Sequence, residues 1–213
     1  MKGRRLRRRC ALPDTVNIMV LVSGGGTNLQ ALLDAEKSGN LGAGKIALVV
    51  SDHPGVYALD RAKAAGVPSV VTEPDKTIPQ DQRRRALSDQ ILQLAKTHHI
   101  DLIVLAGFLS ILTGDIIQQY SGKMINLHPA LLPQFGGRGM YGEHVHRAVL
   151  NSGEKESGCT VHLVDAGTDT GPILLQRTVP VLPDDTPETL AQRIHTEEHI
   201  AIVEAVRMMV GKM

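Results

Sequence analysis

The chain has 213 residues, a formal net charge of +1 and 42% hydrophobic residues, the composition of a globular domain with a sizeable core. No apolar run approaches the ~18 residues that suggest a membrane span, so we expect no membrane protein. Three tyrosines, two phenylalanines and no tryptophan offer little for stacking nucleic-acid bases, so we expect small-molecule substrates and no nucleic acid. Cys10 and Cys159 make neither a disulfide framework nor a metal knuckle, which favours the cytoplasm.

The first fifteen residues are strongly basic, and six of the chain's 23 Lys and Arg residues lie before Cys10. Basic segments of this kind bind nucleic acid in some proteins, but this one has no interleaved aromatic residues. We interpret residues 1–15 as a basic, disordered extension. Residues 16–213 are expected to form a single domain, in which acidic residues outnumber basic ones.

From Val16 onward, short β-branched apolar runs alternate with amphipathic stretches, the pattern of βαβ units. Strands are predicted at 17–22, 45–51, 69–72, 101–106, 124–127, 159–164 and 173–181. Helices are predicted at 28–37, 56–65, 80–98, 113–120, 143–151 and 187–210, the last with Thr186 as its N-cap and Pro187 at its first position. We expect an α/β fold, an open, mainly parallel twisted sheet of about seven strands with helices on both faces, Rossmann-like in type.

A glycine loop, residues 23–28 (Ser-Gly-Gly-Gly-Thr-Asn), joins the first strand to the first helix. Thr27 and Gln30 have the spacing of a capping box, so the helix is predicted to begin here. Its unpaired N–H groups and positive dipole end would then face the loop, where an anion such as phosphate fits.

Two familiar phosphate motifs do not account for this loop. The Walker loop fails because no Gly-Lys-Ser/Thr follows the glycines. The dinucleotide fingerprint is partial, since Leu29 stands where its third glycine belongs, although Asp52 has a position suited to a ribose ligand. A tight turn without a ligand remains a further alternative.

Asn126 and His128 lie on a predicted strand, where the period of two puts both on the same side. They lie at its carboxyl end, the edge at which open α/β sheets bind ligands. An amide that donates a hydrogen bond and an imidazole that donates a proton near neutral pH suit an oxyanion. A loop-capping network would explain the same pair.

The turn-rich loop 165–172 joins two strand-like runs and carries two further carboxylates, Asp165 and Asp169. A calcium loop is a poor fit, because glycine is missing after Asp169 and the twelfth position is Gln176. Asp169 is therefore a candidate for tuning an imidazole.

Four motifs together resemble the folate-dependent formyltransferases, in that family's order: residues 23–30 (SGGGTNLQ), 104–109 (VLAGFL), 125–133 (INLHPALLP) and 160–172 (TVHLVDAGTDTGP). The resemblance covers about residues 16–210, and the glycine loop narrows it to the glycinamide ribonucleotide branch. It implies direct transfer of the formyl group of 10-formyltetrahydrofolate to the amine of 5'-phosphoribosylglycinamide, in purine synthesis and without a metal. By this resemblance Asn126 and protonated His128 hold the oxyanion, and His128 gives a proton to the departing folate nitrogen. Asp169 raises the pKa of His128 and takes the proton of the amine through water.

The resemblance also assigns the ligand-binding residues. The substrate phosphate is expected at Gly26, Thr27 and Asn28, with His195 nearby, and Glu198 is expected to hold the substrate amine or ribose. Glu198 has independent support, because it falls on the apolar stripe of the last helix, although a structural ion pair would explain it too. The folate is expected against Leu109, Ser110, Ile111, Leu112, Val164 and Asp165, with Arg84 near its carboxylate tail. Ser110, where many relatives carry a basic residue, and a long loop at 136–142 depart from the family pattern.

Several alternatives stay open. A formyltetrahydrofolate deformylase would use the same Asn, His and Asp, but we expect it to carry an extra N-terminal domain, and methionyl-tRNA formyltransferase a C-terminal one. His195, Glu198 and His199 match the inverted zinc-peptidase pattern. A non-catalytic nucleotide-binding module would use the glycine loop alone. His144 and His146 are interpreted as surface residues, and a homodimer remains open.

Overall fold

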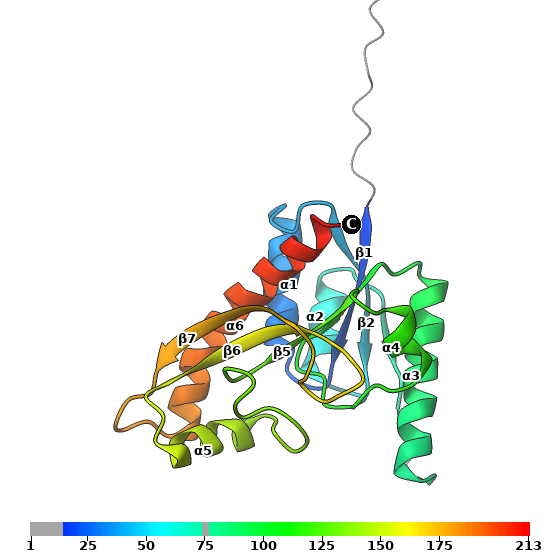
Figure 1. Ribbon diagram of the computed structural model, residues 1–213. Coiled ribbons are helices and arrows are strands. Elements are labelled where there is room, and N and C mark those ends of the chain that lie inside the picture. Colours follow the sequence, from blue (N-terminus) through cyan, green and yellow to red (C-terminus); the bar gives the residue numbers. More distant parts are fainter. Residues whose placement is uncertain (1–14, 74–76) are drawn as a thin grey trace, which may run out of the picture.

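The computed structural model describes residues 15–73 and 77–213 (Figure 1), so residues 1–14 of the predicted basic extension lie outside the described part. Its strands are β1 (Val16–Val22), β2 (Gly44–Ser51), β3 (Ser69–Val71), β4 (Leu102–Leu105), β5 (Met124–His128), β6 (Glu156–Leu163) and β7 (Ile173–Pro180). Its helices are α1 (Thr27–Lys37), α2 (Tyr57–Ala64), α3 (Gln80–Thr97), α4 (Asp115–Gln119), α5 (Glu143–Ser152) and α6 (Pro187–Val210). Each predicted element is present, with ends that differ by a few residues.

The strands form a seven-stranded sheet in the order β3-β2-β1-β4-β5-β6-β7. The pairs from β3 to β5 are parallel, whereas β6 and β7 join antiparallel. This confirms the predicted open, mainly parallel sheet. From β1 the chain winds outward to β2 and β3, then returns to β4 and continues the other way. The strand order therefore reverses between β1 and β4, where sheets of this kind leave a crevice at the carboxyl ends of the strands.

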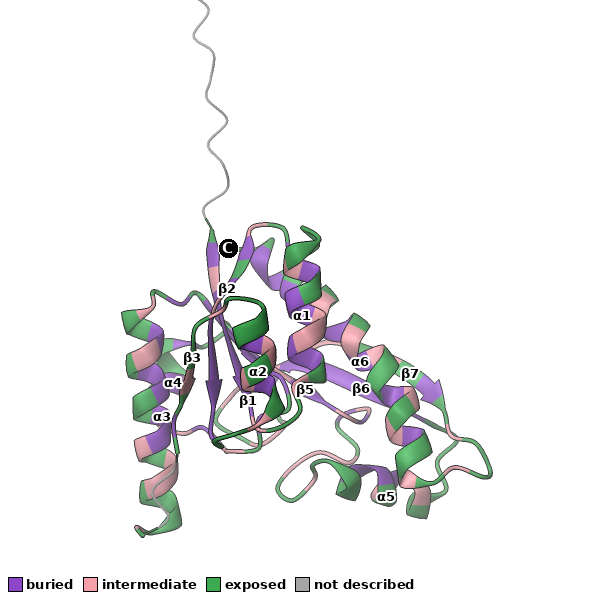
Figure 2. Cartoon of the chain, turned by 180° about the vertical axis from the view of Figure 1, so that it is seen from behind, coloured by how far each residue is buried: buried purple, intermediate pink, exposed green. Residues whose placement is uncertain are grey.

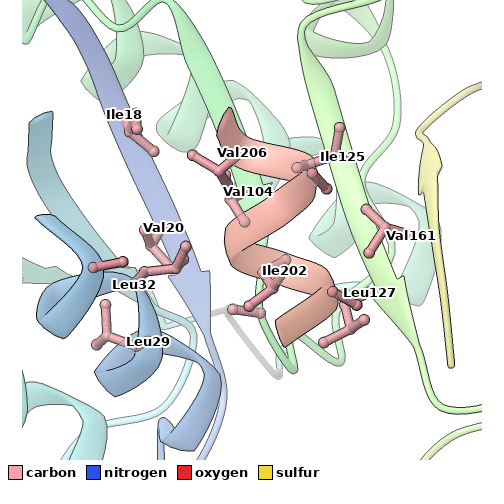
Figure 3. Close-up of a cluster of buried hydrophobic side chains, with 14 of the residues drawn as sticks. Ile18, Val20, Leu29, Leu32, Val104, Ile125, Leu127, Val161, Ile202 and Val206 are labelled. Carbon is pink, nitrogen blue, oxygen red and sulfur yellow. The ribbon is translucent and has the colours of Figure 1, made fainter. Parts of the chain in front are cut away.

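Two cores lie on the two faces of the sheet, because alternate residues of a strand point to opposite sides. Ile18 and Val20 of β1 face one core, which α1, α2, α5 and α6 cover. Figure 3 shows this core with side chains from α1 and α6 beside those of the strands. Met19 and Leu21 face the other, which α3 and α4 cover. The central strands are consequently buried on both faces, while the helices keep exposed outer surfaces (Figure 2).

The two best-defined helix starts differ in how they are capped. Thr186 caps α6 as predicted, with its side chain accepting a hydrogen bond from the Thr189 N–H and Pro187 at the first turn. The capping box predicted for Thr27 and Gln30 is wrong. Thr27 is the first helical residue of α1, and Gly26 occupies the N-cap position without any side-chain cap bond. The glycine takes the left-handed conformation that this abrupt turn from β1 requires.

Within residues 15–73 and 77–213, no helix combines the length and apolar character needed to cross a bilayer.

Candidate active site

A cavity of about 1420 Å³ lies at the carboxyl ends of β1, β2, β4 and β5, lined by the loops that follow these strands. This is the ligand-binding edge of open α/β sheets. The structure brings to its wall every candidate residue predicted from the sequence: Gly26, Thr27, Asn28, Arg84, Leu109, Ser110, Ile111, Leu112, Asn126, His128, Val164, Asp165, Asp169, His195 and Glu198.

Asn126 and His128 both line this cavity, as the period of the strand predicts. Asp169 reaches them from the loop between β6 and β7. The Asn126 amide donates to Asp169 Oδ1 at 3.4 Å, and the His128 Nδ1 lies 3.6 Å from Asp169 Oδ2. An amide, an imidazole and a carboxylate thus meet at one point of the cavity wall.

Burial dominates the titration of His128. Its Nε2 lies 2.8 Å from the carbonyl oxygen of Phe135, and since a carbonyl can only accept, Nε2 carries a proton. Burial lowers the pKa of His128 below its ordinary 6.5, and the Asp169 charge and the Phe135 carbonyl, which both raise it, do not cancel that effect. Asp169 thus raises the pKa of His128 as predicted, but burial outweighs this effect and the net pKa is lowered.

Asp169 is held as a carboxylate. Burial by itself raises its pKa, but His162, the Gly137 N–H at 2.9 Å and His128 together lower the pKa below its ordinary 3.8. Its backbone is left-handed, with φ of 57°, as is that of Phe135 with φ of 55°. Conformations of this kind cost non-glycine residues on the order of 1–3 kcal/mol and cluster at functional sites, where the surrounding structure enforces them.

The glycine loop presents the start of α1 to the cavity. Gly26 has φ of 70°, and a Cβ atom on it would lie 2.6 Å from the Cβ of Ala58 on α2. Both the backbone conformation and the close approach of α2 therefore require glycine here. Because no side chain caps the helix, its first N–H groups stay at the cavity wall, where the helix dipole favours an anion.

Glu198 is a buried carboxylate beside this helix start, with 4% of its surface exposed. Its Oε2 accepts a hydrogen bond from the Asn28 amide at 3.1 Å and lies 3.8 Å from the His195 Nε2. The buried position predicted from the apolar stripe of α6 is confirmed. Its partners within the described part of the chain are an amide and an imidazole instead of a lysine or arginine.

A model of the formyl transferase family matches residues 16–206. The chain belongs to the formyl transferase family. The match spans β1 to α6 and includes the glycine loop, the β5 pair and the Asp169 loop.

Named relatives agree with this assignment. The chain is 44% identical over 196 residues to the trifunctional purine biosynthetic protein adenosine-3 of Drosophila melanogaster, which is 91% of this chain and 14% of that protein. It is 37% identical to the chloroplastic phosphoribosylglycinamide formyltransferase of Arabidopsis thaliana, over 91% of this chain and 65% of the plant protein. It thus spans less than two thirds of both proteins.

Among solved structures, this chain is similar to glycinamide ribonucleotide transformylase 1 from Symbiobacterium toebii. The TM-score is 0.83 at 39% identity, and the match covers 93% of this chain and 89% of that one.

The residues predicted to bind folate, which we call the slot, are tied to neighbouring loops; they are Leu109, Ser110, Ile111, Leu112, Val164 and Asp165. The Leu109 N–H donates to the Ser23 hydroxyl at 2.8 Å, and the Ser110 hydroxyl donates to Asp52 Oδ2 at 2.6 Å. Asp52 is buried, and its other oxygen lies 2.8 Å from the Nδ1 of His53. Asp52 therefore links the slot to the end of β2.

On the opposite wall of the slot, Asp165 closes its own loop. Its Oδ1 accepts hydrogen bonds from the Gly167 N–H at 3.0 Å and from the Thr170 hydroxyl at 2.7 Å. Arg84, near the start of α3, lines the same cavity.

Sequence reasoning missed two histidines of the cavity wall. No role was predicted for His162, yet its Nε2 lies 3.1 Å from the Asn126 amide nitrogen and 3.6 Å from Asp169 Oδ1. Its pairing opposite Asn126 in the antiparallel β5 and β6 places it there, and this register is not readable from the sequence.

The surface position predicted for His146 is wrong, whereas His144 is exposed as predicted. His146 is 4% exposed and lines the cavity, and burial, with the charges of His195 and His128, lowers its pKa to about 4. It lies three residues before buried Val149 on α5, a helical spacing that could have revealed it.

The zinc-peptidase pattern on α6 does not assemble into a metal site. In residues 15–73 and 77–213, no group of three His, Cys, Asp or Glu side chains is arranged to hold a metal ion. The His195 Nε2 lies near Glu198, whereas the buried His199 Nε2 has no hydrogen-bond partner among the described residues.

Proposed function

We propose that this formyl transferase moves the formyl group of 10-formyltetrahydrofolate onto the amine of 5'-phosphoribosylglycinamide, in de novo purine biosynthesis. The observation that carries the proposal is the meeting of Asn126, His128 and Asp169 in a cavity whose far wall is the uncapped start of α1. Relatives named for glycinamide ribonucleotide formyl transfer support the choice of substrate.

The reaction is a direct transfer. The amine nitrogen attacks the formyl carbon, and the carbonyl electrons move onto oxygen to give a tetrahedral oxyanion. The Asn126 amide and protonated His128 donate hydrogen bonds to this oxyanion, which carries charge only in the transition state and intermediate. Asp169 is a carboxylate because its pKa is lowered, and it receives the amine's proton through a water molecule.

Collapse of the oxyanion breaks the bond between the formyl carbon and the folate nitrogen. His128 delivers its proton to that departing nitrogen, which leaves tetrahydrofolate and the formylated amide. Because burial lowers the pKa of His128, its imidazolium is a stronger acid than an exposed one and suits this transfer.

The substrates occupy opposite ends of the cavity. The phosphate binds at Gly26, Thr27 and Asn28 with His195 nearby, and Glu198 holds the amine or ribose. A buried carboxylate whose hydrogen-bond donor is the Asn28 amide is suited to an amine or a hydroxyl group. The folate lies in the slot, formed by Leu109, Ser110, Ile111, Leu112, Val164 and Asp165, and its carboxylate tail extends toward Arg84.

The proposal needs small molecules and no metal, nucleic acid or membrane. A cytoplasmic location suits it, since Cys159 is a free, buried thiol. A homodimer stays open, and gel filtration with light scattering decides it.

One assay tests the function. The protein is incubated with 10-formyltetrahydrofolate, with and without glycinamide ribonucleotide, and release of tetrahydrofolate is followed. Release that requires glycinamide ribonucleotide is expected. Release without it would identify a deformylase instead, and no release in either case would identify a binding module.

A further inference from the structure

The three glycines at 24–26 have all their carbonyl groups engaged. The Gly24 carbonyl accepts a hydrogen bond from the Ala58 N–H at 3.2 Å. The Gly25 carbonyl accepts one from the Arg61 Nε–H at 2.8 Å, and the Gly26 carbonyl one from the Gln30 N–H at 2.9 Å. Two of these donors belong to α2 and one to α1 itself. Every carbonyl of the loop is therefore held by one of the two helices beside it.

These bonds fix the direction of the next N–H groups. In a trans peptide, the carbonyl of one residue and the N–H of the following residue point in opposite directions. The N–H groups of Gly25, Gly26 and Thr27 consequently point away from the donors that hold the carbonyls. All three residues line the cavity, so the loop forms a concave row of N–H groups of the kind that binds anions.

Arg61 makes the one contact among these that a substitution can remove, because Ala58 and Gln30 donate through backbone N–H groups. The guanidinium also donates through Nη1 to the Gln30 side chain at 3.0 Å, and it lies 4.7 Å from the ring centre of Tyr57. It is thus held from three sides with a fixed orientation. Arg61 is not one of the described residues that line the cavity, so it acts from the side of the loop that faces away from the cavity.

We propose that Arg61 is a positioning residue for the substrate phosphate. By holding the Gly25 carbonyl outward, it keeps the Gly26 N–H directed at the phosphate without touching the ligand itself. This rests on the proposed function, which puts the phosphate at this loop. The forked guanidinium is essential, because it bonds the loop and α1 at the same time, and a lysine ammonium offers a single point of charge.

The test uses the full chain with Arg61→Ala and Arg61→Lys, and Lys63→Ala as the matched control. Lys63 is exposed on the same helix, so its loss removes the same charge without touching the loop. Ribose 5-phosphate binding is measured by calorimetry, and kcat and KM by the formyl-transfer assay. Both Arg61 variants should bind ribose 5-phosphate about tenfold more weakly, the typical effect of losing a charge-assisted hydrogen bond. KM for glycinamide ribonucleotide should rise in parallel, with kcat and KM for the formylfolate unchanged.

Full binding by Arg61→Lys would overturn the proposal, since charge alone would then suffice. An equal loss in Lys63→Ala would overturn it as well. If Arg61→Ala does not fold, as judged by its thermal unfolding, Arg61→Lys and Gln30→Ala carry the test with the same expectations. Failure of the proposed function is separate: wild-type protein would then bind ribose 5-phosphate but form no product from glycinamide ribonucleotide.

Discussion

The Nδ1 of His128 lies 3.6 Å from Asp169 Oδ2, while the Nε2–H of the same ring is held by the Phe135 carbonyl. The proton on Nε2 is therefore fixed, and Nδ1 is the nitrogen that gains and loses a proton. It does so beside a carboxylate whose pKa is lowered, so Asp169 stays ionised at neutral pH. The pair is arranged to receive a proton from one substrate and release it to the other.

His128→Ala should lower kcat by about 10²- to 10³-fold, the usual cost of losing one oxyanion donor, with binding of glycinamide ribonucleotide largely intact. The phosphate loop and Glu198 do not depend on the imidazole. Rapid-quench turnover and calorimetric binding check both parts, with His144→Ala on exposed His144 as control. Unchanged turnover in His128→Ala would rule out the assigned role.

Asp169→Asn should lower the pKa of His128 further. Burial already lowers it, and the Asp169 charge is the largest effect in the opposite direction. NMR titration of the imidazole resonances should show a pKa below 6.5 in the wild type and a smaller value in the variant. Asp165→Asn is the matched control, because that carboxylate bonds its own loop. An unchanged or increased pKa in Asp169→Asn would contradict the electrostatic account.

His146 should make the fold sensitive to acid. Its pKa of about 4 in the folded chain lies below the ordinary 6.5, so between these pH values the unfolded chain takes up a proton that the folded chain does not. This contribution to stability is constant above pH 6.5 and falls as pH decreases toward 4, by on the order of 2–3 kcal/mol.

Urea unfolding of wild type and His146→Gln at pH 7.5, 6 and 5 checks this. The unfolding free energy of His146→Gln should fall less between pH 7.5 and 5 than that of the wild type, whereas that of His144→Gln should fall as much as the wild type. Parallel pH curves for wild type and His146→Gln would show that His146 does not titrate as described.

Glu198→Gln should raise KM for glycinamide ribonucleotide about tenfold, since it keeps the shape but removes the charge that faces the amine or ribose. KM for the formylfolate should not change. Glu197→Gln is the adjacent control, because Glu197 pairs with Arg177 outside the cavity. Steady-state kinetics with each substrate varied in turn distinguish the two, and similar KM values in wild type and Glu198→Gln would remove Glu198 from the site.

Gly26→Ala should be more damaging than Gly39→Ala, although both glycines have left-handed backbones, with φ of 70° and 76°. A Cβ atom at Gly39 meets open space, so this variant should cost about 1 kcal/mol of conformational strain. At Gly26 the same strain adds to a 2.6 Å approach to Ala58, so α2 or the loop must shift. Unfolding free energies and ribose 5-phosphate affinity measure both effects. Equal costs and intact binding at Gly26 would show that the loop is not held by α2.

The fold was readable from the residues because its signals are local. Short β-branched apolar runs in β1 and β4, and the helical period of α1, α3 and α6, predicted each element within a few residues of its place. The Thr186 and Pro187 start of α6 was readable for the same reason. At Thr27 the local rule failed, because Gly26, packed against α2, takes the N-cap position and the helix starts one residue earlier than a capping box would place it.

The side-chain period placed Asn126 and His128 on the same side of a strand end, and the resemblance to the formyltransferases joined them with Asp169 and the glycine loop in one site. The pKa values and contacts of these residues depend on the packing of segments that are distant in the sequence. Burial lowers the pKa of His128 by more than Asp169 raises it, the register of β5 with β6 brings His162 to Asp169, and α2 brings Arg61 behind the glycine loop. The local sequence pattern predicts which face of a strand or helix a residue lies on. Desolvation and contacts between distant strands and helices arise only once the chain has folded.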